Sequence, residues 1–262
     1  MESVLVLLLI GAVAGVMAGL LGIGGGLITV PALAMLFEHQ GVNADVVMRC
    51  ALGTSLAAMI FTSISSVRAH HARGAVRWPI VRQIAPGLVI GAFVGPAIAH
   101  WLPGKALKVI FGVFLLLVAV QLARGAATQA HRTLPGPWPM RAWGVVIGVL
   151  SSLFGIGGGT ISVPFMTWCS VPIVQAVGTA ATLGVPIALT GTVGYLITGM
   201  YADGLPLWSV GYVVLPAFVS LALATTLFAP LGARLAHRLD HRLLRRVFAL
   251  FLVVVGVRLL VV

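Results

Sequence analysis

Two copies of the pentapeptide Gly-Ile-Gly-Gly-Gly interrupt apolar sequence, the first at 22–26 and the second at 155–159. Each copy is followed, at the same spacing, by a hydroxyl residue and a proline: Thr29 and Pro31, then Ser162 and Pro164. Because glycine has no Cβ, its backbone amides can point at a ligand. A hydroxyl residue shortly before a proline is typical of a helix start, where free amides and the helix dipole attract an anion. The pattern predicts two such helix starts, with Thr29 and Ser162 as N-caps and the prolines in the first turn.

A glycine-rich break inside hydrocarbon is tolerated only where the backbone is buried in protein or lines a polar cavity. Two related breaks that meet near the membrane midplane form the binding site of many secondary transporters. Glycine runs also allow helices to pack closely, and this second interpretation stays open for each copy. A dinucleotide-binding fingerprint is excluded because neither copy fits G-x-G-x-x-G.

The candidate substrate-binding residues come from the two breaks and from a second repeated motif. Ala-x-Gly-Thr stretches at 51–54 and 176–179 place small hydroxyl residues inside apolar sequence. Such residues bond a substrate or, more often, bond back to their own helix or let a neighbouring helix approach. Arg49, one turn before Gly53, is expected at the membrane surface rather than in the site. The predicted binding residues are Gly24, Gly25, Gly26, Thr29, Gly53, Thr54, Ser55, Gly157, Gly158, Gly159, Thr160, Ser162, Gly178 and Thr179.

Acidic residues are rare, and all five are at expected helix ends or loops: Glu2, Glu38, Asp45, Asp203 and Asp240. The sequence therefore has no carboxylate relay within the membrane, the usual device for coupling to cations, and a cation is a poor candidate for the substrate. Neither a nucleophile–base pair nor a cluster of metal ligands is present, so we expect a protein that is not an enzyme and uses no cofactor or metal. Cys50 and Cys169 have no C-x-x-C partner and are expected to be structural thiols.

The composition predicts an all-α, multi-pass membrane protein. Hydrophobic residues make up 60% of the 262 residues and charged residues only 8%, which is too little polar surface for a soluble domain of this size. The net charge of +11 comes from Lys and Arg at expected helix ends, so it favours membrane topology over nucleic-acid binding. Apolar runs long enough to span a bilayer occupy 3–36 (broken), 46–67, 83–101, 106–123, 142–168 (broken), 172–198, 206–232 and 244–262.

The repeated motifs divide the chain into a first repeat at 1–123, a polar linker at 124–141 and a second repeat at 142–262. Each repeat is expected to hold one glycine-broken helix hairpin and three membrane helices. Gly74 and Trp78 of the first repeat are paired with Gly204 and Trp208 of the second. Parallel repeats would place eight Lys and Arg residues on each side of the membrane, whereas inverted repeats would place twelve on one side and four on the other. The positive-inside rule therefore predicts inverted repeats.

With its two Gly-Ile-Gly-Gly-Gly…Val-Pro motifs at 22–31 and 155–164 and its two Ala-x-Gly-Thr stretches, the chain resembles the TauE/SafE family of sulfite exporters and anion permeases. The resemblance covers essentially the whole chain. It implies a multi-pass permease of the bacterial inner membrane that moves small anions, such as sulfite, sulfonates or other organosulfur and organic anions, usually outward. It also implies that the glycines of both breaks belong to the substrate path. The two repeats are unequal, since Ser55 pairs with Ala180 and Leu27 with Thr160.

Two other functions stay open at the level of sequence. A passive anion channel would use the same site chemistry. A thiol-redox membrane protein would relay electrons through Cys50 and Cys169, and we disfavour it. The expected partners are a small anion and the lipid bilayer. The identity of the anion, the direction of transport, the coupling ion and the formation of a homodimer are left open.

Overall fold

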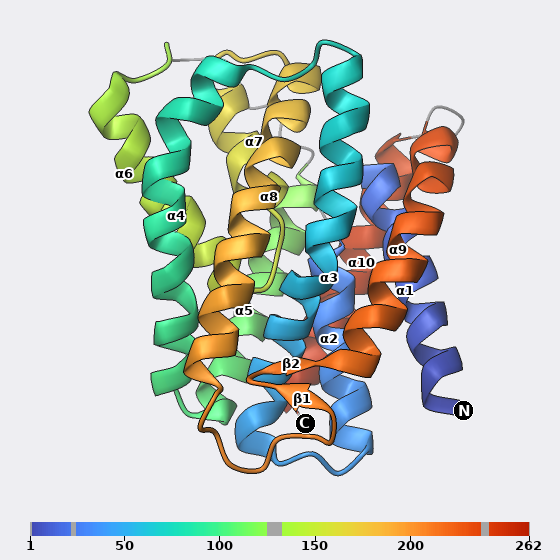
Figure 1. The fold of residues 1–262 in the computed structure, drawn as a ribbon. Helices are drawn as coiled ribbons and strands as arrows, with labels where there is room; N and C mark the ends of the chain where they lie inside the picture. Colours follow the sequence, from blue (N-terminus) through green and yellow to red (C-terminus); the bar gives the residue numbers. More distant parts are fainter. Residues whose placement is uncertain (1, 22–24, 125–132, 237–240, 262) are drawn as a thin grey trace.

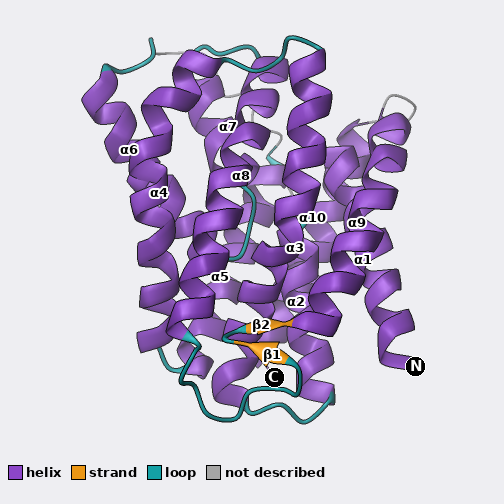
Figure 2. Cartoon of the chain, viewed as in Figure 1, coloured by secondary structure: helices purple, strands orange, loops and turns teal. Residues whose placement is uncertain are grey.

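The computed structural model describes residues 2–21, 25–124, 133–236 and 241–261, and within them the regular elements are helices apart from one short β-hairpin (Figure 2). The elements are α1 (Glu2–Leu21), α2 (Gly26–His39), α3 (Ala44–Ala72), α4 (Trp78–Trp101), α5 (Gly104–Ala123), α6 (Pro137–Leu153), α7 (Gly159–Trp168), α8 (Ile173–Thr198), β1 (Ser209–Val210), β2 (Val213–Val214), α9 (Leu215–Ala236) and α10 (His241–Val261).

The predicted membrane segments are confirmed as helices, with two refinements. Both broken runs divide at their glycines, the first into α1 and α2 and the second into α6 and α7. The run predicted at 206–232 opens with the β-hairpin, so its helix begins only at Leu215. Pro216 occupies the second position of α9, where the missing amide is not needed for the helix.

Four of the described helices, α3, α4, α5 and α8, are long and apolar enough to cross a bilayer. Large apolar side chains also cover the outside of the molecule. On α5 and α9, for example, Leu117 and Leu227 are well over half exposed. A soluble protein rarely leaves so much apolar surface uncovered, whereas lipid tails accept it. The structure is therefore that of an all-α polytopic membrane protein.

The helices of the two halves run in opposite directions in Figure 1. In that view α3 and α5 rise and α4 descends, whereas α8 and α10 descend and α9 rises. The principal packing pairs also cross between the halves: α1 packs on α9, α6 packs on α4, α3 packs on α8, and α5 packs on α10. In the two repeats α1 corresponds to α6 and α4 to α9, so the first two pairs are equivalent. The last two pairs each join a helix to its own counterpart.

Glycines at corresponding positions bring the outer pairs into close contact. Gly15 of α1 faces the backbone of Thr225 in α9, and Gly148 of α6 faces the backbone of Leu88 in α4. A Cβ on Gly15 would lie 2.8 Å from the Thr225 carbonyl oxygen, and one on Gly148 would lie 2.8 Å from the amide nitrogen of Ala92. Small residues allow such backbone contact between membrane helices, where no water drives association.

Candidate functional site

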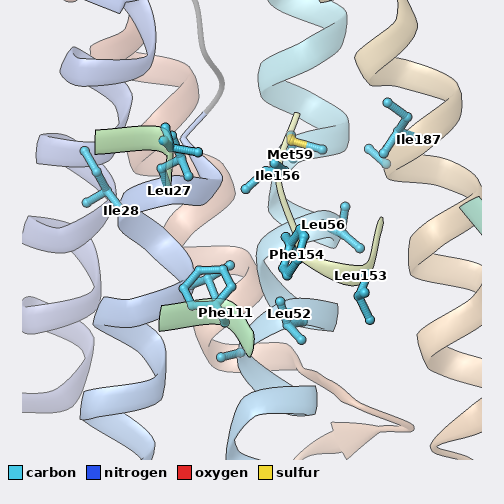
Figure 3. Packing of buried hydrophobic residues seen from close by; sticks show 14 of the residues in the cluster. Leu27, Ile28, Leu52, Leu56, Met59, Phe111, Leu153, Phe154, Ile156 and Ile187 are labelled. Carbon is cyan, nitrogen blue, oxygen red and sulfur yellow. The ribbon is translucent and has the colours of Figure 1, made fainter. Parts of the chain in front are cut away.

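The two glycine breaks contact one another inside the molecule. A Cβ on Gly26, the first residue of α2, would overlap the carbonyl oxygen of Gly155 and lie 2.8 Å from the Cα of Ile156. Figure 3 shows Leu27 and Ile28 at the start of α2 beside the segment that carries Phe154 and Ile156. The two breaks are thus one structural unit, although 133 residues separate their motifs.

A short chain of hydrogen bonds joins the first break to the second. Ser55 Oγ of α3 donates to the carbonyl oxygen of Gly155 at 3.2 Å. Thr29 Oγ1 lies 2.6 Å from Ser55 Oγ and also 3.2 Å from the carbonyl oxygen of Gly25. We name this chain the Thr29–Ser55–Gly155 bridge. Thr29 and Ser55 have one proton each for these three contacts, so either hydroxyl can be the donor within the pair.

The helix starts lie earlier than predicted. Gly25 and Gly158 are the N-cap residues, so the prediction that Thr29 and Ser162 cap the helices is wrong. Both hydroxyl residues stand at the fourth helical position, and Pro31 and Pro164 stand at the sixth, inside the helix. Glycine is acceptable as an N-cap. Each proline instead removes the amide that would bond the carbonyl four residues earlier.

The second break is fully enclosed by protein. Residues 155–159 are buried, Thr160 is 8% exposed and Ser162 is 0% exposed. Within the described part of the chain, the amides of residues 157–159 donate to no backbone carbonyl. Such free amides are expected at a helix start, and the helix dipole adds partial positive charge there. The second break therefore holds unused hydrogen-bond donors in a water-poor interior.

The N-cap glycines have different neighbours. A Cβ on Gly158 would lie 3.1 Å from Ile187 Cδ1 and 3.2 Å from the carbonyl oxygen of Ala180, both on α8. A Cβ on Gly25 would meet only Ala14 of α1, at 3.6 Å or more. Gly24 of the predicted site lies outside the described residues. Gly157 lies in the second break, and Gly159 is the first residue of α7.

The Ala-x-Gly-Thr motifs hold loops. Thr54 Oγ1 accepts a hydrogen bond from the amide of Val214, and Thr179 Oγ1 accepts one from the amide of Arg77, both at 3.0 Å. The neighbouring glycines fit against the same two loops: a Cβ on Gly53 would lie 2.8 Å from the carbonyl oxygen of Tyr212, and one on Gly178 would lie 2.6 Å from that of Ala75. These four predicted site residues anchor the segments that lead into α9 and α4. Of the predicted residues in this group, the structure brings Ser55 into hydrogen-bond contact with the breaks.

The same contacts correct the pairing of the two repeats in this region. Arg77 and Val214 occupy corresponding places, so Gly74 corresponds to Gly211 and Pro79 to Pro216. Gly204 and Gly211 both share the positive φ of Gly74, so the hydrogen bonds to Thr54 and Thr179 decide the pairing. The pairing of Gly74 and Trp78 with Gly204 and Trp208 is therefore wrong by seven residues. The loop between α8 and α9 is longer than the loop between α3 and α4, and its extra residues precede the turn that contains Gly211.

Arg49 does not reach the breaks. Its Nε and Nη2 donate to the carbonyl oxygens of Ala99 and Leu102 at 3.0 and 2.7 Å, at the end of α4. Tyr212 lies beneath its guanidinium, 5.8 Å from ring centre to Cζ, and the Tyr212 hydroxyl lies 3.1 Å from His100 Nδ1. Burial raises the pKa of the Tyr212 phenol, and the nearby Arg49 charge opposes that rise. This cluster fastens the end of α4 to the loop before α9.

Two residues outside the predicted set lie at the second break. Gly155 provides the carbonyl that receives the Ser55 hydrogen bond, and its φ of +60° favours glycine. It lies inside the repeated pentapeptide, so the motif itself contained the signal. Ser151, near the end of α6, is 0% exposed, and within the described residues its hydroxyl has no partner. Ser151 and its neighbour Ser152 look alike in the sequence, so nothing there singles out Ser151.

The buried polar side chains of the described interior belong to Ser and Thr, and no Asp, Glu, Lys or Arg is buried there. The core can therefore offer hydroxyls and backbone amides to a solute but no ionised side chain. Cys50 and Cys169 are both buried free thiols. Their burial keeps both away from soluble thiols.

Comparison with known proteins gives matches along nearly the whole chain. The family model for the sulfite exporter TauE/SafE matches residues 7–259. A probable membrane transporter protein of Haemophilus influenzae is 34% identical over 257 residues, which cover 98% of this chain and 97% of that protein. One of Methanocaldococcus jannaschii is 30% identical over 258 residues, with 97% and 94% covered. No solved structure matches the chain.

Both glycine breaks and both Ala-x-Gly-Thr motifs lie inside the matched range. The named relatives are similar along their full length, so the likeness extends to the whole fold rather than to one segment. Together with its long apolar helices, this makes the protein a multi-pass membrane transporter. The chain belongs to the sulfite exporter TauE/SafE family.

Proposed function

We propose that this transporter exports small anions, namely sulfite, sulfonates or related organosulfur and organic anions, through a site at the two helix breaks. The observation that carries the proposal is the meeting of the two breaks in the interior, with the starts of α2 and α7 beside them. Helix starts present amides and partial positive charge, which favour an anion over a cation. Family membership supports a sulfur oxyanion as the first candidate.

The donor set of the site suits an oxyanion. Its available groups are backbone amides and the hydroxyls of serine and threonine, all of which can donate a hydrogen bond. A sulfite or sulfonate group has only acceptor oxygens, so each donor can be used without leaving a buried proton unpaired. The absence of buried ionised side chains from the described interior also allows the anion to leave, because a fixed ion pair would hold it tightly.

The closeness of the breaks suggests how access would alternate. In the arrangement described here, Gly26 and Gly155 are in contact and the second break is enclosed. Transport requires the breaks to separate toward one side of the membrane and then toward the other. The helix pairs that cross between the halves can rock as units around such a site. Alternating access of this kind makes transport saturable and slow compared with a channel.

Efflux of radiolabelled sulfite from proteoliposomes tests the function. Wild-type protein should release the anion with saturable kinetics, and Gly158→Leu should stop release because a large side chain collides with Ile187 and Ala180. Gly136→Leu is the matched control, since no atom lies within 4 Å of a Cβ at that position. Currents in a planar bilayer far above transporter turnover would identify a channel instead. Failure of every small oxyanion tested to cross with wild-type protein would contradict the proposal.

A further inference from the structure

The two breaks differ in how their hydroxyl residues are paired. In the first repeat, Thr29 lies 2.6 Å from Ser55, and Ser55 donates to Gly155. In the second repeat, the counterpart of Thr29 is Ser162 and the counterpart of Ser55 is Ala180, which has no hydroxyl. The hydroxyl of Ser162 is 0% exposed and, within the described residues, forms no hydrogen bond. The substitution at position 180 thus removes the partner that the first repeat provides.

An unpaired hydroxyl in this place needs an explanation. Burying a hydroxyl without a hydrogen bond is unfavourable, and native structures rarely keep one without a water, an ion or a ligand. The described part of the chain contains six such buried polar atoms, and two of them, the hydroxyls of Ser151 and Ser162, lie on the two helices that the second break connects. The corresponding positions in the first repeat hold Ala18 and Thr29. Unpaired hydroxyls therefore flank the second break.

The surroundings place Ser162 at the start of α7. It stands one helical turn after the N-cap Gly158, and residues four apart lie on the same face of a helix. Gly158 packs against Ala180 and Ile187 of α8, so this face of α7 is directed at α8. The free amides of residues 157–159 lie at the same helix end. A buried hydroxyl donor and free amides therefore lie within one turn of each other at the start of a ten-residue helix.

We propose that the second break holds the transported anion and that Ser162 donates a hydrogen bond to one of its oxygens. Thr29 and Ser55 take no part in binding, because the Thr29–Ser55–Gly155 bridge already uses their hydroxyls. This inference rests on the proposed function and assigns its substrate contacts to one of two similar half-sites. Ser162 is then the residue that discriminates oxyanions from isosteric solutes without an acceptor, since such solutes would leave its proton unpaired.

Binding measurements on the purified full-length protein, by titration calorimetry with sodium sulfite and with methanesulfonate, test the assignment. Ser162→Ala should raise the Kd about ten-fold or more, as expected for a lost hydrogen bond to a charged group. Ser162→Thr keeps the hydroxyl, uses the residue type of the first repeat, and should stay within about three-fold of wild type. Ala180→Ser should weaken binding by about ten-fold, because the new hydroxyl pairs with Ser162 as Ser55 pairs with Thr29.

Thr29→Val is the matched variant in the first break. It should leave the Kd within about two-fold of wild type and lower the thermal midpoint, because the buried hydrogen bond between residue 29 and Ser55 is lost. Ser162→Ala should not lower the midpoint of the ligand-free protein, because the hydroxyl it removes has no partner to lose. This second readout separates a binding role from a structural role. It also keeps the test valid if Ala180→Ser fails to fold.

Each outcome has one meaning. Wild-type affinity in Ser162→Ala, with weakened binding in Thr29→Val, would overturn the assignment and leave the proposed function intact. Wild-type affinity in both variants would place the anion away from both hydroxyls and would also overturn it. If wild-type protein binds neither anion nor any other small oxyanion, the proposed function itself fails.

Discussion

At the level of single residues, the glycines of the first break differ in how much space surrounds them. A Cβ on Gly26 would overlap the carbonyl oxygen of Gly155, and the nearest atoms belong to backbone that cannot turn away. A Cβ on Gly25 would be in ordinary contact with Ala14 at 3.6 Å. Gly26→Ala should therefore push the two breaks apart and lower the thermal midpoint and the transport rate together. Gly25→Ala should leave both close to wild type.

Efflux of sulfite and thermal unfolding in detergent can be measured on the same two preparations. The comparison is sharp because the variants add the same methyl group at adjacent positions. Wild-type stability and transport in Gly26→Ala would mean that the breaks are not packed as described. Loss of transport in Gly25→Ala, without loss of stability, would instead indicate that an anion needs the space beside Ala14.

The threonines of the Ala-x-Gly-Thr motifs provide a second test at this scale. Thr54 and Thr179 each accept a hydrogen bond from a loop amide, at Val214 and Arg77. Thr54→Val keeps the shape of the side chain but leaves the buried amide unpaired, which costs about 1–3 kcal/mol. We expect a lower thermal midpoint and an unchanged Kd for sulfite. Thr179→Val should behave in the same way, and a large change in Kd with unchanged stability would return these residues to the binding site.

The sequence identified the residues of the breaks because their glycines and hydroxyls repeat at a fixed spacing. It could not separate binding residues from anchoring residues, because Thr29, Thr54 and Thr179 all look alike in the sequence. Their difference depends on the partner: Thr29 meets the side chain of Ser55 on the next helix, α3, whereas the other two meet backbone amides of distant loops. Contacts between segments more than 100 residues apart leave no mark on local composition.

At the level of secondary-structure elements, hydrophobic length predicted the helices well and their starts less well. The missed starts of α2 and α7 have a common cause. The helices α2 and α7 begin on glycine, so no capping side chain marks the start, and their prolines lie in the second turn. The hairpin before α9 was missed because its valines are as apolar as a membrane helix. Apolar periodicity reports burial, and it cannot distinguish a short buried strand from the end of a helix.

The contact between α4 and α6 makes a prediction about helix packing. A Cβ on Gly91 of α4 would overlap the carbonyl oxygen of Val145 in α6 and lie 2.8 Å from the amide of Val149. Gly91→Ala should therefore destabilise the protein by about 1–3 kcal/mol or more, despite the better helix propensity of alanine. The measurement is urea or thermal unfolding in detergent micelles.

Gly112 of α5 is the control for this change. Its added Cβ would lie 3.1 Å from the side chain of Leu260, which can shift, and 3.2 Å from the carbonyl oxygen of Gly256, a much milder approach than the overlap at Gly91. Gly112→Ala should therefore be close to neutral or slightly stabilising. Equal effects of the two substitutions would show that helix propensity, and not contact between the backbones of α4 and α6, determines the response at Gly91.

At the level of the whole molecule, the two ends differ in charge. The α3–α4 loop carries Arg73 and Arg77, and in Figure 1 it lies at the end opposite the α8–α9 loop and both chain termini. The α8–α9 loop has an exposed acidic residue, Asp203, and no Lys or Arg between residues 199 and 208. Positively charged loops are retained in the cytoplasm. The arrangement therefore predicts that the two loops face opposite sides of the membrane.

Single cysteines in a Cys50→Ser/Cys169→Ser background can locate the two loops in intact cells. Asp203 and Arg73 are both exposed, so a cysteine at either position can react. We expect a membrane-impermeant maleimide to label Asp203→Cys from outside, and to label Arg73→Cys, on the cytoplasmic side, only after the cells are permeabilised. Gly41→Cys, in the exposed turn between α2 and α3, should behave like Asp203→Cys, since that turn lies at the same end as the α8–α9 loop. Parallel repeats would place the loops after α3 and α8 on the same side. Labelling of Arg73→Cys and Asp203→Cys from one side only would therefore rule out opposed halves, and with them a site built from two oppositely directed helix starts.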